Sequence, residues 1–258
     1  MQNEFDDSCD NNCGLFDFMA NTIGMKVLHP GGYDATDKLI SQFDLNKESN
    51  VLDLACGAGT TSFYLSNKYD CNITGIDIST SLIGIANNRL KESKNKVKFE
   101  VANAIKLPFP DNTFDFVIAQ AFFILIDEKH KALNEIYRVL KPNGYFGSLE
   151  LSWFTTPTNE AYDELLKKTC NNFIPRVVKF EEWELFFNSQ GFNHLKTIKN
   201  KMPSGMLQTI KIEGLINSLK IMYKMMSNSK NRKRMMDVQN TFGKYDDYIG
   251  YGIFSFKK

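Results

Sequence analysis

The stretch Val51–Ser62 restricts the fold of this chain more than any other part of the sequence. Its first five residues, Val51–Ala55, are mostly apolar and predict a buried strand. Gly57 and Gly59 predict a tight turn after it, and a helical pattern begins at about Thr60. Glycines let the backbone pass close to a ligand, and the start of a helix adds free N–H groups and a positive dipole end. The stretch therefore predicts a strand–turn–helix unit that binds a nucleotide-like ligand.

Asp53 indicates which nucleotide-like ligand this turn would accept. The dinucleotide fingerprint G-x-G-x-x-G usually has no acid just before it, and Ser62 stands where its third glycine would fall. A carboxylate at Asp53 would repel a pyrophosphate but attract an ammonium group. We therefore predict S-adenosylmethionine, which has an α-ammonium and an adenosine but no phosphate. A nicotinamide-linked oxidoreductase is the alternative that Asp53 and Ser62 disfavour.

A second acid lies at the distance that this prediction requires. Cys71–Ile78 is an apolar-rich run, and Asp77 near its end lies 20 residues after Gly57. That is about the spacing at which an acid ending the second strand accepts hydrogen bonds from ribose hydroxyls.

The alternation of strands and helices predicts the topology of the sheet. We expect strands at about 51–55, 72–77, 97–101, 114–119 and 145–151, with helices at about 60–68, 80–92 and 128–139. Strands that alternate with helices at this rhythm imply a parallel, doubly wound α/β sheet.

These features together resemble class I S-adenosylmethionine-dependent methyltransferases, especially the ubiquinone-biosynthesis-like branch. The resemblance rests on Asp53 with the glycine turn, the connector Leu107–Asn112, the strand Phe114–Ala119 and the turn Leu140–Gly144, and it covers about residues 30–200. Ala55 replaces the first glycine of the family's motif. The resemblance implies a methyltransferase with a mostly parallel seven-stranded Rossmann-like sheet, whose last two strands form an antiparallel hairpin.

Two helical segments fall outside that sheet, and we expect a single domain over 1–258. Residues 1–45 are expected to form an N-terminal cap over the ligand edge, and residues 46–200 the cofactor-binding core. The segment 203–247 predicts a Met-rich helical insert before the final strand at 248–257. Such an insert can serve as added core, as the face of a homodimer or as a lid over an apolar substrate.

The resemblance also implies which residues hold the cofactor. Asp53, Ala55, Gly57 and Gly59 would line its methionine end, together with Gln120 at the end of the fourth strand. Asp77 would bind the ribose and Ile78 would pack on the adenine. Asn103 and Ala104 stand where the family often has Asp-Ala next to the adenine amino group.

Residues on the acceptor side are less specific. Methyl transfer needs orientation of the acceptor more than a catalytic group, so we expect neither a triad nor a metal. In the cap, His29 is a candidate base, and Tyr33 is a candidate contact with the cofactor's carboxylate or with the acceptor. Phe122 and Trp153 would either wall the acceptor pocket or belong to the core.

The cysteines leave one alternative acceptor open. The segment around Cys170 is similar to arsenite methyltransferases, in which soft thiolates hold trivalent arsenic. Cys9 and Cys13 could join Cys170, so a thiol or arsenic acceptor is a second hypothesis. No C-x-x-C pair is present, and we expect reduced thiols and a cytoplasmic protein.

Charge, motif and hydropathy disfavour nucleic acid and a membrane span, so we expect a small-molecule substrate. The formal net charge is +1, no N-P-P-[YF] motif follows the fourth strand, and no apolar run reaches the length of a membrane span. We therefore expect neither nucleic acid nor a transmembrane helix. The basic run Lys230–Arg234 indicates a solvated helix face or attraction of an acidic partner. A catalytically silent cofactor-binding subunit is the alternative from another functional class.

Overall fold

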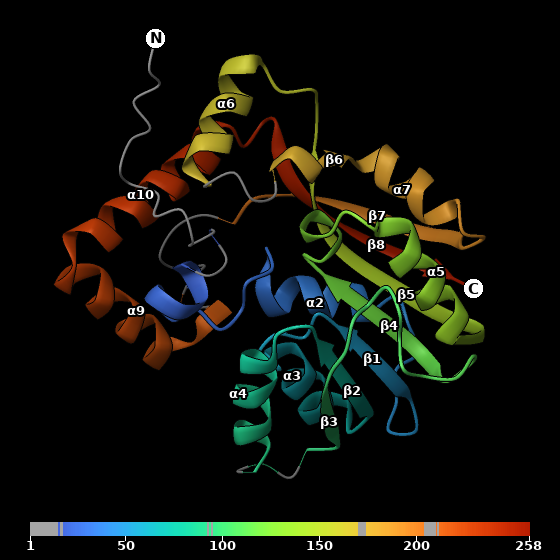
Figure 1. Ribbon diagram of the computed structural model, residues 1–258. Coiled ribbons are helices and arrows are strands. Elements are labelled where there is room, and N and C mark those ends of the chain that lie inside the picture. Colours follow the sequence, from blue (N-terminus) through green and yellow to red (C-terminus); the bar gives the residue numbers. More distant parts are fainter. Residues whose placement is uncertain are drawn as a thin grey trace.

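The computed structural model describes residues 15, 18–91, 93, 95–169, 174–203, 210 and 212–258. A central sheet crosses the molecule in the order β3-β2-β1-β4-β5-β8-β7, and the short β6 pairs with β5 (Figure 1). The strands are β1 (Asn50–Leu54), β2 (Asn72–Asp77), β3 (Val97–Val101), β4 (Phe114–Gln120), β5 (Leu140–Trp153), β6 (Val178–Lys179), β7 (Asn193–Lys201) and β8 (Ile249–Lys257). The predicted doubly wound α/β fold is confirmed.

The direction of each strand follows the predicted plan. β1 pairs in parallel with β2 and β4, β2 with β3, and β4 with β5. β8 is antiparallel to both β5 and β7, so the last two strands form the expected hairpin at the edge of the sheet. β1 and β4 are apolar on both faces because helices cover the centre of the sheet from both sides.

Successive residues of β5 face two different helical layers. A Cβ on Gly147 would lie 2.8 Å from Leu39 in α2, whereas the ring of Phe146 packs on Phe187 in α7. The helices of the first layer are α2 (Gly32–Ile40), α3 (Thr60–Tyr69) and α4 (Thr80–Leu90), and those of the second are α5 (Lys129–Val139) and α7 (Phe180–Asn188).

The helical insert lies beside the N-terminal cap. Its helices α9 (Leu215–Ser227) and α10 (Ser229–Lys244) lie between β7 and β8 in sequence, and Figure 1 shows them with the blue π-helical turn η1 (Phe18–Ile23) at one side of the molecule. α10 also contacts α6 (Asn159–Lys168). The carboxylate of Glu213 accepts hydrogen bonds from the backbone N–H groups of Lys26 and Val27, at 2.9 and 3.1 Å. The insert is therefore fastened to the cap.

Several local expectations were wrong or incomplete. α2 begins at Gly32, after Gly31 in the left-handed conformation, within the segment expected only as part of the cap. β5 starts at Leu140, five residues before the expected Tyr145, because the Leu140–Gly144 segment extends the pairing with β4 across a bulge. β6 and two short 3-10 helices, η2 (Phe123–Leu125) and η3 (Ile174–Arg176), were not predicted.

Candidate cofactor and acceptor site

The residues predicted to bind the cofactor lie at the carboxyl ends of β1, β2, β3 and β4. The chain runs from β1 to β2 and β3 on one side, and returns to β4 and β5 on the other. This makes β1 the topological switch point, where a doubly wound sheet forms its ligand crevice.

The turn between β1 and α3 has the backbone conformation that its glycines predict. Gly57 and Gly59 have φ values of +55° and +76°, and Ala55 adopts +59° despite its Cβ. A Cβ on Gly59 would lie 2.4 Å from the Phe99 ring, whereas one on Gly57 would meet no protein atom within 4 Å. Gly59 is therefore required by the core. Gly57 faces open space, which fits a ligand lying against the backbone there.

Asp53 lies behind this turn and is almost completely buried. The Ser62 hydroxyl donates a hydrogen bond of 2.5 Å to its Oδ2, which ties β1 to the first turn of α3. Ser62 thus occupies the third-glycine position of the dinucleotide pattern with a donor for Asp53. Burial raises the pKa of Asp53 to about 7, against the opposing effect of the Ser62 hydrogen bond, and the nearby charge of Asp77 raises it further.

Asp77 lies at the end of β2 and binds the backbone of two neighbouring segments. Its two oxygens accept hydrogen bonds from the backbone N–H groups of Gly57 and Ser79, each at 2.9 Å. The Ser79 hydroxyl in turn caps α4 by accepting a hydrogen bond from the Leu82 N–H. Asp77 therefore fixes the glycine turn and the start of α4 together, and its remaining lone pairs are at the switch point.

The residues expected around the adenine flank Asp77. Ile78 directly follows it and is 71% exposed, as an apolar platform for a planar ligand would be. Asn103 follows β3, and its amide oxygen accepts from the Ile105 N–H at 3.1 Å, so the side chain is held beside Ala104. Arg89 in α4 was not predicted to belong to the site, and its guanidinium donates a hydrogen bond of 2.6 Å to the carbonyl of Ala58 inside the glycine turn.

Gln120 connects the cofactor edge to the cap through a chain of side chains. Its Oε1 accepts from the Thr61 hydroxyl at 3.1 Å, and its Nε2 donates to Thr36 Oγ1 at 2.9 Å. Thr36 Oγ1 lies 3.5 Å from His29 Nε2. The structure therefore links Gln120 and His29, which stand 91 positions apart in the sequence.

The two cap candidates have different environments. His29 is buried, and burial lowers the pKa of its imidazole to about 4, so the ring is neutral at physiological pH. Tyr33 is half-buried and stacks on Tyr64 with 4.2 Å between the ring centroids. Burial also raises the pKa of Tyr33, which keeps its hydroxyl protonated.

The remaining candidates on the acceptor side lie deeper in the core or outside the described residues. Phe122 is buried against Phe123. The Trp153 indole N–H donates a hydrogen bond of 2.8 Å to the Val177 carbonyl, so packing in the core accounts for both residues. Cys170 lies outside the described residues, as do Cys9 and Cys13. Among the residues that the structure describes, no cluster of His, Cys, Asp or Glu could hold a metal ion.

Glu150, a buried carboxylate inside β5, was not predicted to belong to the site either. Its Oε1 accepts hydrogen bonds of 3.0 Å from the backbone N–H groups of Phe122 and Phe123, and 3.2 Å from the Ser148 hydroxyl. Its Oε2 is buried and has no hydrogen-bond partner among the residues that the structure describes. Burial raises the pKa of Glu150 to about 7, although the backbone N–H groups oppose this shift. Glu150 therefore fixes the loop after Gln120. In the sequence, a carboxylate between Leu149 and Leu151 was the feature that could have indicated this role.

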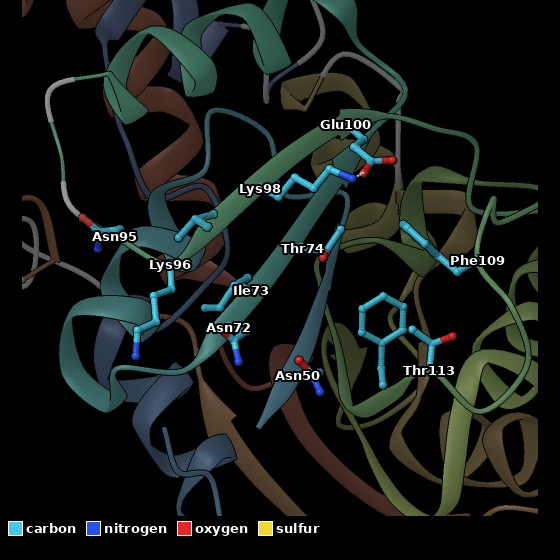
Figure 2. Close-up of a pocket in the computed structure, with 12 residues that line it drawn as sticks. Asn50, Asn72, Ile73, Thr74, Asn95, Lys96, Lys98, Glu100, Phe109 and Thr113 are labelled. Atoms are coloured by element: carbon cyan, nitrogen blue, oxygen red, sulfur yellow. Dashed lines mark ion pairs between the residues drawn. The ribbon is translucent and has the colours of Figure 1, made fainter. Parts of the chain in front are cut away.

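A polar groove of about 600 Å³ lies elsewhere on the sheet (Figure 2). It begins at the amino ends of the strands, at Asn50 and Asn72, and extends to Lys98 and Glu100, which form an ion pair. The connector after β3, including Phe109, lines its other side where a doubly wound fold would place a helix. Because none of the residues that line this groove belongs to the glycine turn, we do not assign the cofactor to it.

Comparison with known proteins agrees with this geometry. Residues 52–147 match the family model of a methyltransferase domain. The chain is 33% identical over 177 residues to the ubiquinone/menaquinone biosynthesis C-methyltransferase UbiE of Rickettsia bellii, covering 65% of this chain and 67% of that protein. It is 28% identical over 174 residues to the phosphoethanolamine N-methyltransferase of Plasmodium falciparum, covering 67% and 64%. The chain spans only about a quarter of plant phosphoethanolamine N-methyltransferases.

Two solved structures share the fold over most of the chain. The MccD protein superposes with a TM-score of 0.73 at 26% identity, covering 89% of this chain and 99% of that one. The phosphoethanolamine N-methyltransferase 2 of Haemonchus contortus, in complex with S-adenosyl-L-methionine, superposes with a TM-score of 0.71 at 18% identity, covering 95% and 60%. Within the described part of the chain, no helix combines the length and the apolar character needed to cross a membrane.

Proposed function

This chain belongs to the class I S-adenosylmethionine-dependent methyltransferases, and from that premise we propose that it methylates a small-molecule acceptor by in-line displacement. S-adenosylmethionine supplies an electrophilic methyl group on a positively charged sulfur. The work left to the protein is to hold the acceptor atom in line and to exclude water. Orientation of this kind can contribute roughly 7–11 kcal/mol to a displacement reaction.

The observation that carries the proposal is the joint placement of Gly57 and Asp77. The N–H of Gly57 is held by Asp77, and the space in front of Gly57 has no protein atom within 4 Å of its missing Cβ. We assign the methionine end to the surface formed by Ala55, Gly57, Gly59 and Gln120, with Asp53 behind it as the counter-charge for the ammonium. Asp77 is assigned to the ribose, and Ile78, Asn103 and Ala104 to the adenine.

The acceptor is assigned to the region between the cap and the insert. The chain from Gln120 through Thr36 to His29 leads from the cofactor edge into the cap. His29 is a candidate base because its imidazole is neutral, and its lowered pKa makes it a weak one. Tyr33 is a candidate contact with the acceptor. The names of two relatives suggest two acceptor classes, an amine that bears a phosphate and a quinone-ring precursor.

Incubation with methyl-labelled S-adenosylmethionine and panels of these two acceptor classes tests the proposal. We expect label in one small-molecule product. A preparation that binds the cofactor but labels no small molecule, including thiols and trivalent arsenic, would instead support the silent cofactor-binding subunit.

Replacing Asp77 with alanine tests the assignment of the ribose. The substitution removes the acceptor for the ribose hydroxyls and also releases the N–H groups of Gly57 and Ser79. We expect the affinity for S-adenosylhomocysteine to fall by about 1–3 kcal/mol, roughly 5- to 150-fold. The control is Glu182→Ala, which removes an exposed carboxylate in α7. Equal affinities for the two variants would refute the assignment.

A further inference from the structure

The outer face of α9 carries a continuous apolar stripe. Its six large apolar side chains are between 38% and 74% exposed, and they are Leu215, Ile216, Leu219, Met222, Tyr223 and Met226. At 3.6 residues per turn, this spacing places all six on about one third of the helix circumference. The opposite face is buried through Asn217 and Ile221. Scattered exposed apolar residues are ordinary, but a stripe of this kind along one helix indicates a docking surface.

The charge around the stripe is strongly one-sided. Between Gly214 and Met236 the sequence has six cationic residues and no Asp or Glu, in a chain whose formal net charge is only +1. Lys220 follows the stripe on α9, while Lys230, Arg232 and Lys233 are exposed in the first two turns of α10. The corner between the two helices therefore places positive charge directly beside the end of the stripe.

The insert is held to the rest of the chain from its other side. Glu213, just before α9, accepts hydrogen bonds from the backbone of Lys26 and Val27. Asn217 Nδ2 donates hydrogen bonds of 2.6 Å to the Glu213 carboxylate and 3.2 Å to the Gly24 carbonyl. Figure 1 shows α9 and α10 at the left side of the molecule, beside the N-terminal cap. The fastened side of α9 thus faces the cap, and its apolar stripe faces outward.

We propose that the apolar stripe of α9, with the cationic corner at the start of α10, docks the protein on an anionic phospholipid surface. An apolar face flanked by Lys and Arg is the pattern of helices that lie in the interfacial plane of a bilayer, where aliphatic side chains enter the acyl boundary and cations meet acidic headgroups. A second copy of this chain fits less well, because stacking two stripes would bring two strongly cationic segments together. Nucleic acid would use the cations but leave the aliphatic stripe exposed to water.

Vesicle sedimentation tests this proposal directly. The full chain is mixed with vesicles of about three parts phosphatidylcholine to one part phosphatidylserine, and separately with pure phosphatidylcholine. We expect binding to the anionic vesicles, at least about tenfold weaker binding to the neutral ones, and weakening with added salt. No binding to the anionic vesicles would overturn the proposal.

Matched variants separate the stripe from a general effect of charge. Leu219→Glu/Met226→Glu adds two carboxylates to the stripe, while Leu185→Glu/Leu195→Glu adds the same charge at exposed apolar positions on α7 and β7. We expect binding to fall at least about tenfold for the first pair and less than about twofold for the second. Leu219→Ser/Met226→Ser, which adds no charge, should also weaken binding.

Retained affinity for S-adenosylhomocysteine shows that each variant is folded, and sedimentation equilibrium reports the oligomeric state. Vesicle binding by Leu219→Glu/Met226→Glu equal to that of the unmodified chain would refute the proposal. A dimer that this double variant dissociates would also refute it, by assigning the stripe to a contact between two copies.

Discussion

Replacing Gly59 with alanine is expected to destabilise the protein by about 2–5 kcal/mol and to abolish measurable cofactor binding. The new Cβ would lie 2.4 Å from the Phe99 ring, and the residue would have to keep a φ of +76°. The left-handed conformation costs an alanine roughly 1–2 kcal/mol, and overpacking a core adds about 1–3 kcal/mol. Chemical denaturation and calorimetric titration with S-adenosylhomocysteine measure the two effects.

Replacing the neighbouring Gly57 with alanine tests the position of the ligand separately from the packing of the core. A Cβ there would meet no protein atom within 4 Å, so Gly57→Ala should cost only the conformational penalty of about 1–2 kcal/mol. We expect this variant to fold but to bind S-adenosylhomocysteine at least about tenfold more weakly, because the methyl group would occupy space assigned to the ligand. Gly243→Ala in α10, which has an unobstructed Cβ position, is the control and should change neither property for the worse. Unchanged cofactor affinity in Gly57→Ala would contradict the assigned position of the ligand.

Replacing Glu150 is expected to have the second large effect. Glu150→Ala would remove the acceptor of the Phe122 and Phe123 N–H groups and leave a cavity in the core. We expect a loss of roughly 3 kcal/mol in the free energy of unfolding near neutral pH, since each buried donor left without a partner costs about 1–3 kcal/mol. Glu150→Gln retains an oxygen that can accept both hydrogen bonds but places an amide group at the unpartnered Oε2 position, so we expect a smaller loss of about 1–2 kcal/mol. Equal losses for the two variants would show that the hydrogen bonds do not matter.

The same residue makes stability depend on pH. Burial raises the pKa of Glu150 to about 7, above its value in the unfolded chain. Between about pH 4.5 and 7 the folded protein therefore binds a proton that the unfolded chain has released, so stability falls as pH rises through this range. The buried Asp53, whose pKa is also raised to about 7, acts in the same direction. Glu150→Gln should reduce this slope and leave the part due to Asp53. An unchanged slope would contradict the raised pKa of Glu150.

Local sequence patterns predicted the central sheet and the position of the glycine turn. The apolar runs of β1 and β4, the positive φ values at Gly57 and Gly59, and the cap at Ser79 all follow from short-range rules. The insert between β7 and β8 was visible as a helical segment that interrupts the final hairpin. These features depend on residues close in sequence or on a repeated alternation of strands and helices.

The contacts that complete the site depend on residues far apart in the chain, and local patterns did not reveal them. Gln120 and Thr36 hydrogen-bond across 84 positions, and Glu150 meets the Phe122 N–H across 28. The alanine at position 55 in the left-handed conformation and the start of α2 at Gly32 also escaped prediction, because tertiary packing set these backbone conformations against the local preference. The acceptor depends on the cap and the insert, where the sequence contains no specific motif.

Calorimetric titration of the purified chain tests the central assignment most directly. A glycine turn with a buried carboxylate behind it should bind S-adenosylhomocysteine with one site per chain and should bind NAD at least about a hundredfold more weakly, because Asp53 disfavours a pyrophosphate and Ser62 replaces the third glycine of the dinucleotide turn. Saturable binding of S-adenosylhomocysteine that weakens in Asp77→Ala is the result we predict. Tight binding of NAD, or no heat with either S-adenosylmethionine or S-adenosylhomocysteine, would contradict the account.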